Sequence, residues 1–266
     1  MTVAHAAATA VLTAAFGAAV GPAPARAVPA NAGQGEVATP AIARAAPIGA
    51  AAAATLPASP RTIQRLALLE RGHHVFERPD HRSRQLTTVR RARPITGLQT
   101  VLPVLGERTG NDGRQWLQVL LPGRPNGARG WISPRFTRYA LTPWSVRVDL
   151  SARTATVVNG RRVVRSFRVV VGAASTPTPT GRFFVEETVR LAADRVGAPF
   201  ALALSARSPV LAQFAGGPGQ IALHGLWNVG GVLGTAVSHG CVRVDERNIR
   251  WLAATVPAGS PVTIGA

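Results

Sequence analysis

Short apolar runs separated by turn-forming residues recur through most of the chain, and this spacing most constrains how the chain can fold. Asn-Asp-Gly at 111–113 and Pro-Asn-Gly at 125–127 are turn sequences. The runs 116–119 and 131–132, which each begin with tryptophan, follow these turns and have the composition of strands. Several short strands at such spacing are typical of a small barrel. We therefore predict a β-barrel over residues 61–141.

The remaining residues, 142–266, also indicate a mainly β structure. Asn159-Gly160, between two β-branched runs, is a strong hairpin signal, and two prolines in the segment 176–181 predict a loop there. One helix is predicted near the C-terminus, where Asp245 is a candidate N-cap and apolar residues repeat at helical spacing before Pro257. The closing run Pro-Val-Thr-Ile is predicted to be a final strand.

Residues 1–27 have the pattern of a signal peptide. An apolar run is followed by Gly21 and Pro22, and the small-x-small triplet at 25–27 is a candidate cleavage site. Residues 28–60 are rich in Ala, Pro and Gly without a sustained period, which predicts a flexible linker. We therefore expect export to the cell wall or extracytoplasmic space, with no stable membrane span after signal removal.

The chain carries a formal net charge of +18, and all 30 of its Lys and Arg residues are arginines. Without lysine, the chain cannot form a Ser-Lys acyl-transfer site, a lysine Schiff base or a P-loop phosphate site. Outside a cell, such a charge favours anionic wall polymers as partners, and we expect no nucleic acid. The alternative is that the charge serves only solubility.

Residues 61–141 contain three histidines and two tryptophans, for which we make separate predictions. His73, His74 and His81 have no cysteine partner and no metal-ligand spacing, so we expect them in a solvated loop. Trp116 and Trp131 are predicted to be core or groove-lining residues of the barrel.

Cys241, in Val-Ser-His-Gly-Cys-Val-Arg, is the only cysteine in the chain. A neighbouring imidazole or cation makes a thiol a better nucleophile by increasing its thiolate fraction. His224 ends an apolar run, and an antiparallel return of the chain would bring it to the thiol. Strand alternation would put His239 on the same face as Cys241, and Gly240 leaves room for backbone N–H groups to face an oxyanion.

Two alternatives to a catalytic thiol were considered. Cys241 could be a small buried apolar residue beside structural histidines, although a lone thiol in an exported protein favours chemistry. His224, His239 and Cys241 could supply three zinc ligands, but no acidic residue stands beside them in the sequence to act as a base. We expect no metal and no cofactor.

His224-Gly225, followed by Ser-His-Gly-Cys-Val-Arg at 238–243, resembles the signature of the L,D-transpeptidases of bacterial cell walls. The runs between about 144 and 264 also resemble the strands and loops of that family. Upstream, D-G-x-x-W-L-Q-V and G-x-x-G-W-I resemble a bacterial SH3-like domain. The implied fold is mainly β: a small SH3-like β-barrel at 61–141, then an L,D-transpeptidase-type β-sandwich with one main helix at 142–266.

The resemblance also implies roles for individual residues. Cys241 would be the nucleophile, His224 the base that takes its proton, and the Gly225 carbonyl would orient the imidazole. His239 and the backbone around Gly240 and Cys241 would help to hold the substrate or the oxyanion.

The other residues of the signature would stabilise the loop around Cys241 or bind the substrate. Ser238 would stabilise the cysteine loop. Arg243 would position that loop or bind a stem-peptide carboxylate, because a guanidinium suits either task.

By this resemblance the protein would be a cysteine acyltransferase acting on peptidoglycan stem peptides, as donor and acceptor. A thioester would form with loss of a terminal D-Ala, and an amine of a second stem would accept the acyl group, giving a 3→3 cross-link. Two alternatives stay open: an L,D-carboxypeptidase with the same residues, or a non-catalytic basic wall-binding protein. In papain-like endopeptidases the cysteine precedes the histidine, whereas here His224 comes first.

Overall fold

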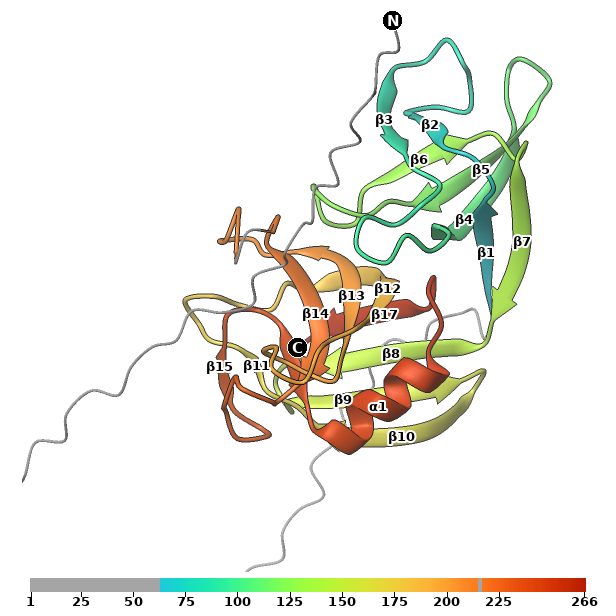
Figure 1. Ribbon diagram of the computed structural model, residues 1–266. Helices are drawn as coiled ribbons and strands as arrows, with labels where there is room; N and C mark the ends of the chain where they lie inside the picture. The colour runs from blue at the N-terminus through green and yellow to red at the C-terminus, as the bar shows by residue number, and fades with distance from the viewer. Residues whose placement is uncertain (1–62, 215–216) are drawn as a thin grey trace, which may run out of the picture. The chain divides into compact units, whose positions relative to one another are not determined.

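The computed structural model describes residues 63–214 and 217–266, which lie within one compact unit of the chain (Figure 1). The predicted signal peptide, 1–27, and the predicted linker, 28–60, lie outside the described residues. The described structure is mainly β with one α-helix, as predicted.

The first seven strands form one antiparallel sheet, the N-terminal sheet, in the order β3-β2-β6-β5-β4-β1-β7. The two predicted turns connect β4 to β5 and β5 to β6, and their glycines have the positive φ that such turns need. The strands are β1 Gln64–Leu69, β2 His73–Phe76, β3 Gln85–Val89, β4 Val101–Thr109, β5 Gln115–Leu120, β6 Arg129–Ile132 and β7 Thr137–Thr142.

Three side chains of the N-terminal sheet test predictions made from the sequence. Trp116 is 1% exposed, which agrees with a core position, and Trp131 is half-buried. His73 is buried within β2, and its ring nitrogens lie 3.0 and 2.9 Å from the carbonyl oxygens of Arg71 and Arg135. The predicted solvated loop was therefore wrong for His73, because two backbone carbonyls satisfy its ring.

The other two histidines of the region 63–142, His74 and His81, are exposed. His74 lies in β2, not in a loop. His81 lies outside the strands and packs its ring 4.5 Å, centroid to centroid, from that of Trp116.

The second half forms an eight-stranded sheet, the C-terminal sheet, in the order β10-β9-β8-β17-β12-β13-β14-β16. The pairs β8–β17 and β14–β16 are parallel, and the others are antiparallel. A short parallel pair, β11 with β15, stands beside it. The strands are β8 Trp144–Asp149, β9 Thr154–Asn159, β10 Arg162–Arg168, β11 Val171–Gly172, β12 Gly181–Arg190, β13 Phe200–Arg207, β14 Gln220–Gly225, β15 Ala236–Ser238, β16 Val242–Val244 and β17 Pro261–Gly265.

The predicted local signals are confirmed in this half. The predicted hairpin joins β9 to β10: Asn159 ends β9 and pairs with Arg162, and Gly160 and Arg161 form the turn. Strand β17 is the predicted last strand. The helix α1, Glu246–Thr255, is N-capped by Asp245, whose carboxylate accepts a hydrogen bond from the Asn248 amide at 3.0 Å. Its buried residues Ile249 and Leu252 pack into the core of the C-terminal sheet.

Strand β12 contributes to two cores at once. Neighbouring residues of a strand point to opposite faces, and here Phe183 packs in the core of the C-terminal sheet while Phe184 packs in that of the N-terminal sheet. Both rings are almost fully buried. The two sheets therefore share an interface through the middle of β12.

Candidate active site

Strands β14 and β16 bring His224 and Cys241 to the same face of the C-terminal sheet. The two strands are parallel, with Leu223 opposite Val242 and His224 opposite Arg243. Side chains alternate along each strand, so Cys241, which immediately precedes β16, shares the face of Arg243 and His224. The predicted antiparallel return was wrong, because β15 carries the connecting chain across to pair with β11 before it enters β16.

A small pocket of about 60 Å³ lies against the thiol. Among the residues predicted from sequence, Cys241, His224, His239, Ser238 and Arg243 line this pocket together. Gly225 and Gly240 contribute backbone groups to the same region, as described below. The pocket thus gathers the chemistry-bearing side chains of the two sequence motifs.

The geometry around His224 fixes which ring nitrogen can accept a proton. Nδ1 lies 2.8 Å from the carbonyl oxygen of Gly225, and a carbonyl can only accept, so Nδ1 carries the hydrogen and Nε2 is free to take a proton. A β-carbon on Gly197 would lie 2.5 Å from His224 Nδ1, so only glycine allows the backbone to pass the ring this closely. Gly197 was not identified from the sequence, where nothing distinguishes it from the chain's other glycines.

Burial lowers the pKa of His224 to about 4, partly opposed by the Gly225 hydrogen bond and assisted by the charge of Arg243. Burial raises the pKa of the Cys241 thiol, against smaller lowering effects of the Ala222 backbone and of Arg243. At neutral pH the site therefore rests as a neutral thiol beside a neutral imidazole. This arrangement suits general-base activation, in which the thiol loses its proton only during attack.

The cysteine loop, residues 238–241, is held by the Ser238 hydroxyl. Ser238 Oγ donates to the Cys241 carbonyl at 2.6 Å and accepts from the Gly240 amide at 3.1 Å. Gly240 has a φ of +113°, which favours glycine over other residues. The Gly240 N–H is thus already bonded to the Ser238 hydroxyl.

Two threonines that the sequence did not reveal as site residues support the cysteine loop from the segment 176–181. Thr178 Oγ1 donates to the Gly240 carbonyl at 2.9 Å and accepts from the Gly172 amide at 2.8 Å. Thr176 Oγ1 donates to the Ser238 carbonyl at 3.0 Å. The sequence predicted a loop here but not its contacts, because a Thr-Pro repeat does not indicate which backbone it will meet.

Arg243 is 6% exposed and holds a neighbouring loop. Its Nη1 donates to the carbonyls of Val229 and Gly230, both at 3.1 Å. Of the two roles expected for this arginine, the geometry supports loop positioning. Its charge also stands close enough to Cys241 to favour a thiolate when one forms.

His239 is exposed and follows the end of β15, so strand alternation does not govern its orientation. Its ring stacks on that of Phe214, with 5.4 Å between centroids and 28° between planes. Phe214 also lines the pocket. It was missed in the sequence, where an isolated aromatic residue in a glycine-rich loop gives no signal.

The part of the chain that the structure describes has neither a metal-binding cluster nor a helix that could cross a membrane. No three His, Cys, Asp or Glu side chains there lie together as a metal site would need. No described helix has both the length and the apolar character needed to cross a membrane.

Comparison with known proteins gives matches in the second half of the chain. Residues 143–264 match the family model of the YkuD L,D-transpeptidase catalytic domain. The chain is 32% identical over 125 residues to the "Putative L,D-transpeptidase YkuD" of Bacillus subtilis, covering 46% of this chain and 66% of that protein. It is 29% identical over 124 residues to L,D-transpeptidase 1 of Mycobacterium tuberculosis, covering 44% of this chain and 48% of that protein.

The matched region spans just under two thirds of the first of these relatives and about half of the second. Among solved structures, an L,D-transpeptidase from Mycobacterium smegmatis aligns at 20% identity with a TM-score of 0.36. That alignment covers 63% of this chain and 91% of the other.

Proposed function

We propose that the protein transfers the acyl group of one peptidoglycan stem peptide to another through a thioester on Cys241, since residues 143–264 match the family model of the L,D-transpeptidase catalytic domain. The observation that carries this proposal is the placement of Cys241 and His224 on one face, with Nδ1 of His224 bound to Gly225 and Nε2 left to accept a proton. Donor and acceptor stems are the proposed partners, and no cofactor enters the chemistry.

In the first half-reaction the thiol sulfur attacks the carbonyl carbon of the third residue of a tetrapeptide stem, while His224 Nε2 takes the thiol proton. Because burial disfavours both a free thiolate and a free imidazolium, proton transfer is coupled to formation of the C–S bond. The tetrahedral intermediate collapses, the C–N bond breaks, and the imidazolium gives its proton to the departing D-Ala amine. A thioester and a neutral imidazole remain.

In the second half-reaction the side-chain amine of another stem attacks the thioester carbonyl. His224 takes one proton from the amine, the C–S bond breaks, and the imidazolium returns that proton to the sulfur. The product is a 3→3 amide cross-link and the regenerated thiol. Water in place of the amine would give an L,D-carboxypeptidase.

Intact-protein mass spectrometry tests this proposal directly. The protein is incubated with a tetrapeptide stem, with and without an amine acceptor, beside Cys241→Ala. An adduct that lacks D-Ala, is absent in Cys241→Ala and is converted by the acceptor into a stem dimer would support transpeptidation. An adduct that only hydrolyses would indicate a carboxypeptidase, and no adduct would favour a non-catalytic wall-binding protein.

The domain arrangement belongs to the same proposal: a signal peptide at 1–27, a linker at 28–60, an SH3-like barrel at 61–141 and the catalytic domain at 142–266. Seven short antiparallel strands in the first half support the SH3-like assignment. The net charge of +18 supports contact with anionic wall polymers. N-terminal sequencing of the secreted protein tests the first boundary, and a mature chain beginning at Val28 is the expected result.

A further inference from the structure

One side of the thiol pocket is formed by a segment with little regular structure. We call residues 208–214 and 217–219, which follow β13, the wall segment. Ser208, Leu211, Phe214 and Gly219 of this segment line the pocket with Cys241. Within the segment, the Ser208 amide donates to the Gly219 carbonyl at 2.8 Å, and Phe214 forms an isolated bridge with Gly217. The Ser208 hydroxyl also accepts from the Val210 and Leu211 amides at 3.4 and 3.0 Å. All these bonds lie within the segment, so its position relative to Cys241 depends on outside contacts.

Those outside contacts come from the loop between β5 and β6 of the N-terminal sheet. Arg124 Nη2 donates to the carbonyls of Ser208 and Leu211 at 2.9 and 3.0 Å. Arg124 Nη1 donates to the Pro218 carbonyl at 2.9 Å. One planar guanidinium therefore joins three backbone points of the wall segment, a task that suits its fixed fork of donors.

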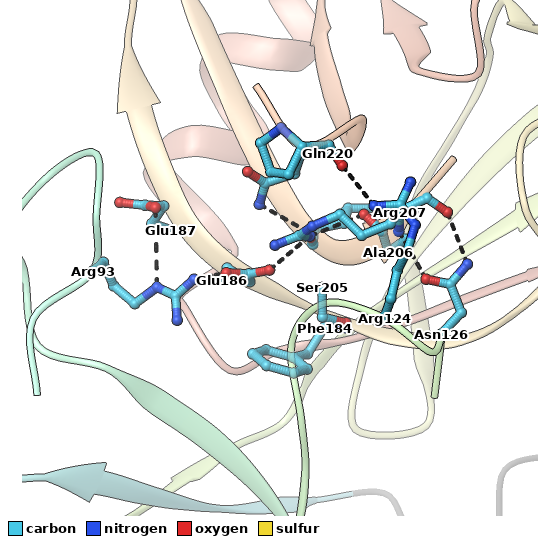
Figure 2. Close-up of polar contacts among 12 residues, drawn as sticks. Arg93, Arg124, Asn126, Phe184, Glu186, Glu187, Ser205, Ala206, Arg207 and Gln220 are labelled. Atoms are coloured by element: carbon cyan, nitrogen blue, oxygen red, sulfur yellow. Dashed lines mark hydrogen bonds and ion pairs between the residues drawn. The ribbon is translucent and has the colours of Figure 1, made fainter. Parts of the chain in front are cut away.

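Asn126 fixes the residue that leads into the wall segment. Its Nδ2 donates to the Arg207 carbonyl and its Oδ1 accepts from the Arg207 amide, both at 2.8 Å (Figure 2). This exchange mimics the paired bonds of two antiparallel strands. The Gly123 amide adds a bond to the Ser205 carbonyl at 3.1 Å. The loop between β5 and β6 thus binds the end of β13 through both a side chain and the backbone.

A buried charge cluster secures the same junction from beneath. Figure 2 shows Arg93 of the N-terminal sheet region reaching Glu186 and Glu187 of β12. Glu186 also accepts from Arg207 Nη1 at 3.0 Å. Arg207 is therefore held at its side chain by Glu186 and at its backbone by Asn126, which leaves it little freedom to move.

We propose that the loop between β5 and β6 shapes the substrate pocket without lining it, with Arg124 and Asn126 as positioning residues that hold the wall segment against Cys241. Neither residue touches the reacting atoms, and each acts through the backbone it binds. The close fit at Gly219 agrees with this role, since a β-carbon there would lie 2.1 Å from the Leu211 carbonyl and 3.3 Å from Arg124 Nη2. The substrate readout below rests on the proposed function, whereas the thiol readout does not.

The test compares Arg124→Ala, Arg124→Lys and Asn126→Asp with wild type, and uses Arg129→Ala, an exposed arginine of β6, as the matched control. The first readout is the rate of alkylation of Cys241 by iodoacetamide in the full chain. The second is the KM and kcat for a tetrapeptide donor. Circular dichroism verifies that each variant is folded.

We expect Arg124→Ala to accelerate alkylation severalfold, because a displaced wall segment uncovers the thiol, and to raise KM about tenfold with a smaller change in kcat. Arg124→Lys should restore little, since an ammonium cannot join three carbonyls. Asn126→Asp should act in the same direction more weakly, and Arg129→Ala should match wild type. If Arg124→Ala does not fold, Asn126→Asp alone decides the question.

Unchanged alkylation in the folded positioning variants would overturn the inference, even if their melting temperatures fell. Should the wild type show no acyl transfer at all, the proposed function fails, while the alkylation rates still test the position of the wall segment.

Discussion

The two sides of the pocket around Cys241 are held in different ways. The cysteine loop is fixed by short hydroxyl-to-backbone bonds from Ser238, Thr176 and Thr178, all within the C-terminal half. The wall segment is fixed by Arg124, which lies 84 residues before its partner Ser208. The side that carries the proposed nucleophile is thus secured by neighbouring loops, and the side proposed to meet the rest of the substrate is secured from the N-terminal half. Reactivity and substrate fit should therefore respond to different substitutions.

The largest effect is expected for a substitution of His224, the proposed proton acceptor on the same side of the pocket as Cys241. His224→Ala removes the proton acceptor and should lower kcat for thioester formation by about 10²- to 10⁴-fold. Phe214→Ala, on the wall side, should change mainly KM. Single-turnover mass spectrometry measures both. A His224→Ala protein with nearly normal kcat would mean that another group takes the thiol proton.

The next largest effect is expected for Glu186, which helps to hold Arg207 just before the wall segment. Glu186→Ala leaves the buried guanidinium groups of Arg93 and Arg207 without this carboxylate, and should lower the free energy of unfolding by ~3–5 kcal/mol. Urea denaturation measures it. The matched control is Glu246→Ala, which breaks an exposed pair with Arg250 and should cost only ~0.3–0.5 kcal/mol. Equal losses in the two variants would contradict the importance of the buried cluster.

The buried His224 should also make the free energy of unfolding depend on pH, an effect that the wall segment does not share. The pKa of His224 is about 4 in the folded chain and 6.5 as an unperturbed group, so the unfolded state binds the proton first as the pH falls. The stability contributed by neutral His224 is complete above pH 6.5 and is lost as the pH falls towards 4. The free energy of unfolding should fall by ~3 kcal/mol in total over this range because of the lowered His224 pKa. Urea denaturation across this range, compared with His224→Gln, should show a smaller acid loss in the variant. Identical curves would mean that the His224 pKa is not lowered.

The smallest expected effect concerns the threonine support of the cysteine loop. Thr178→Val leaves the half-buried Gly172 amide and the buried Gly240 carbonyl without their hydroxyl partner, and should destabilise the fold by ~1–3 kcal/mol. It should also lower kcat about tenfold while KM changes little, because the thiol shifts and the wall does not. Thr156→Val, at an exposed cross-strand pair, is the control. A change confined to KM would contradict this division of roles.

Much of the fold was predictable because its signals are local. The Asp245 cap and the apolar period before Pro257 specified α1, and Asn159-Gly160 specified a hairpin, without reference to distant residues. The direction of β16 was not predictable in this way. A strand's own sequence does not state whether its neighbour runs parallel, and only the path through β15 decides it.

The site divides along the same line. Cys241 and His224 were identified from the sequence because their residue types are rare in this chain and stand in two short motifs. Arg124 could not be identified, since it is one of many arginines and its three partners are backbone carbonyls. Backbone carbonyls exist at every residue, so no sequence pattern marks the ones that an arginine will bind.

Phe184 has a consequence for how such proteins can be rearranged in evolution. Its ring leaves the C-terminal sheet and fills the core of the N-terminal sheet. A gene fragment that began at Pro143 would encode a protein with this phenylalanine exposed beside a pair of uncovered glutamates, a surface prone to self-association. An unrelated domain could replace the first half only if it offered an apolar pocket for Phe184 and a cation to pair with Glu186. Recombination at this boundary is thus limited by one aromatic side chain and the charges around it.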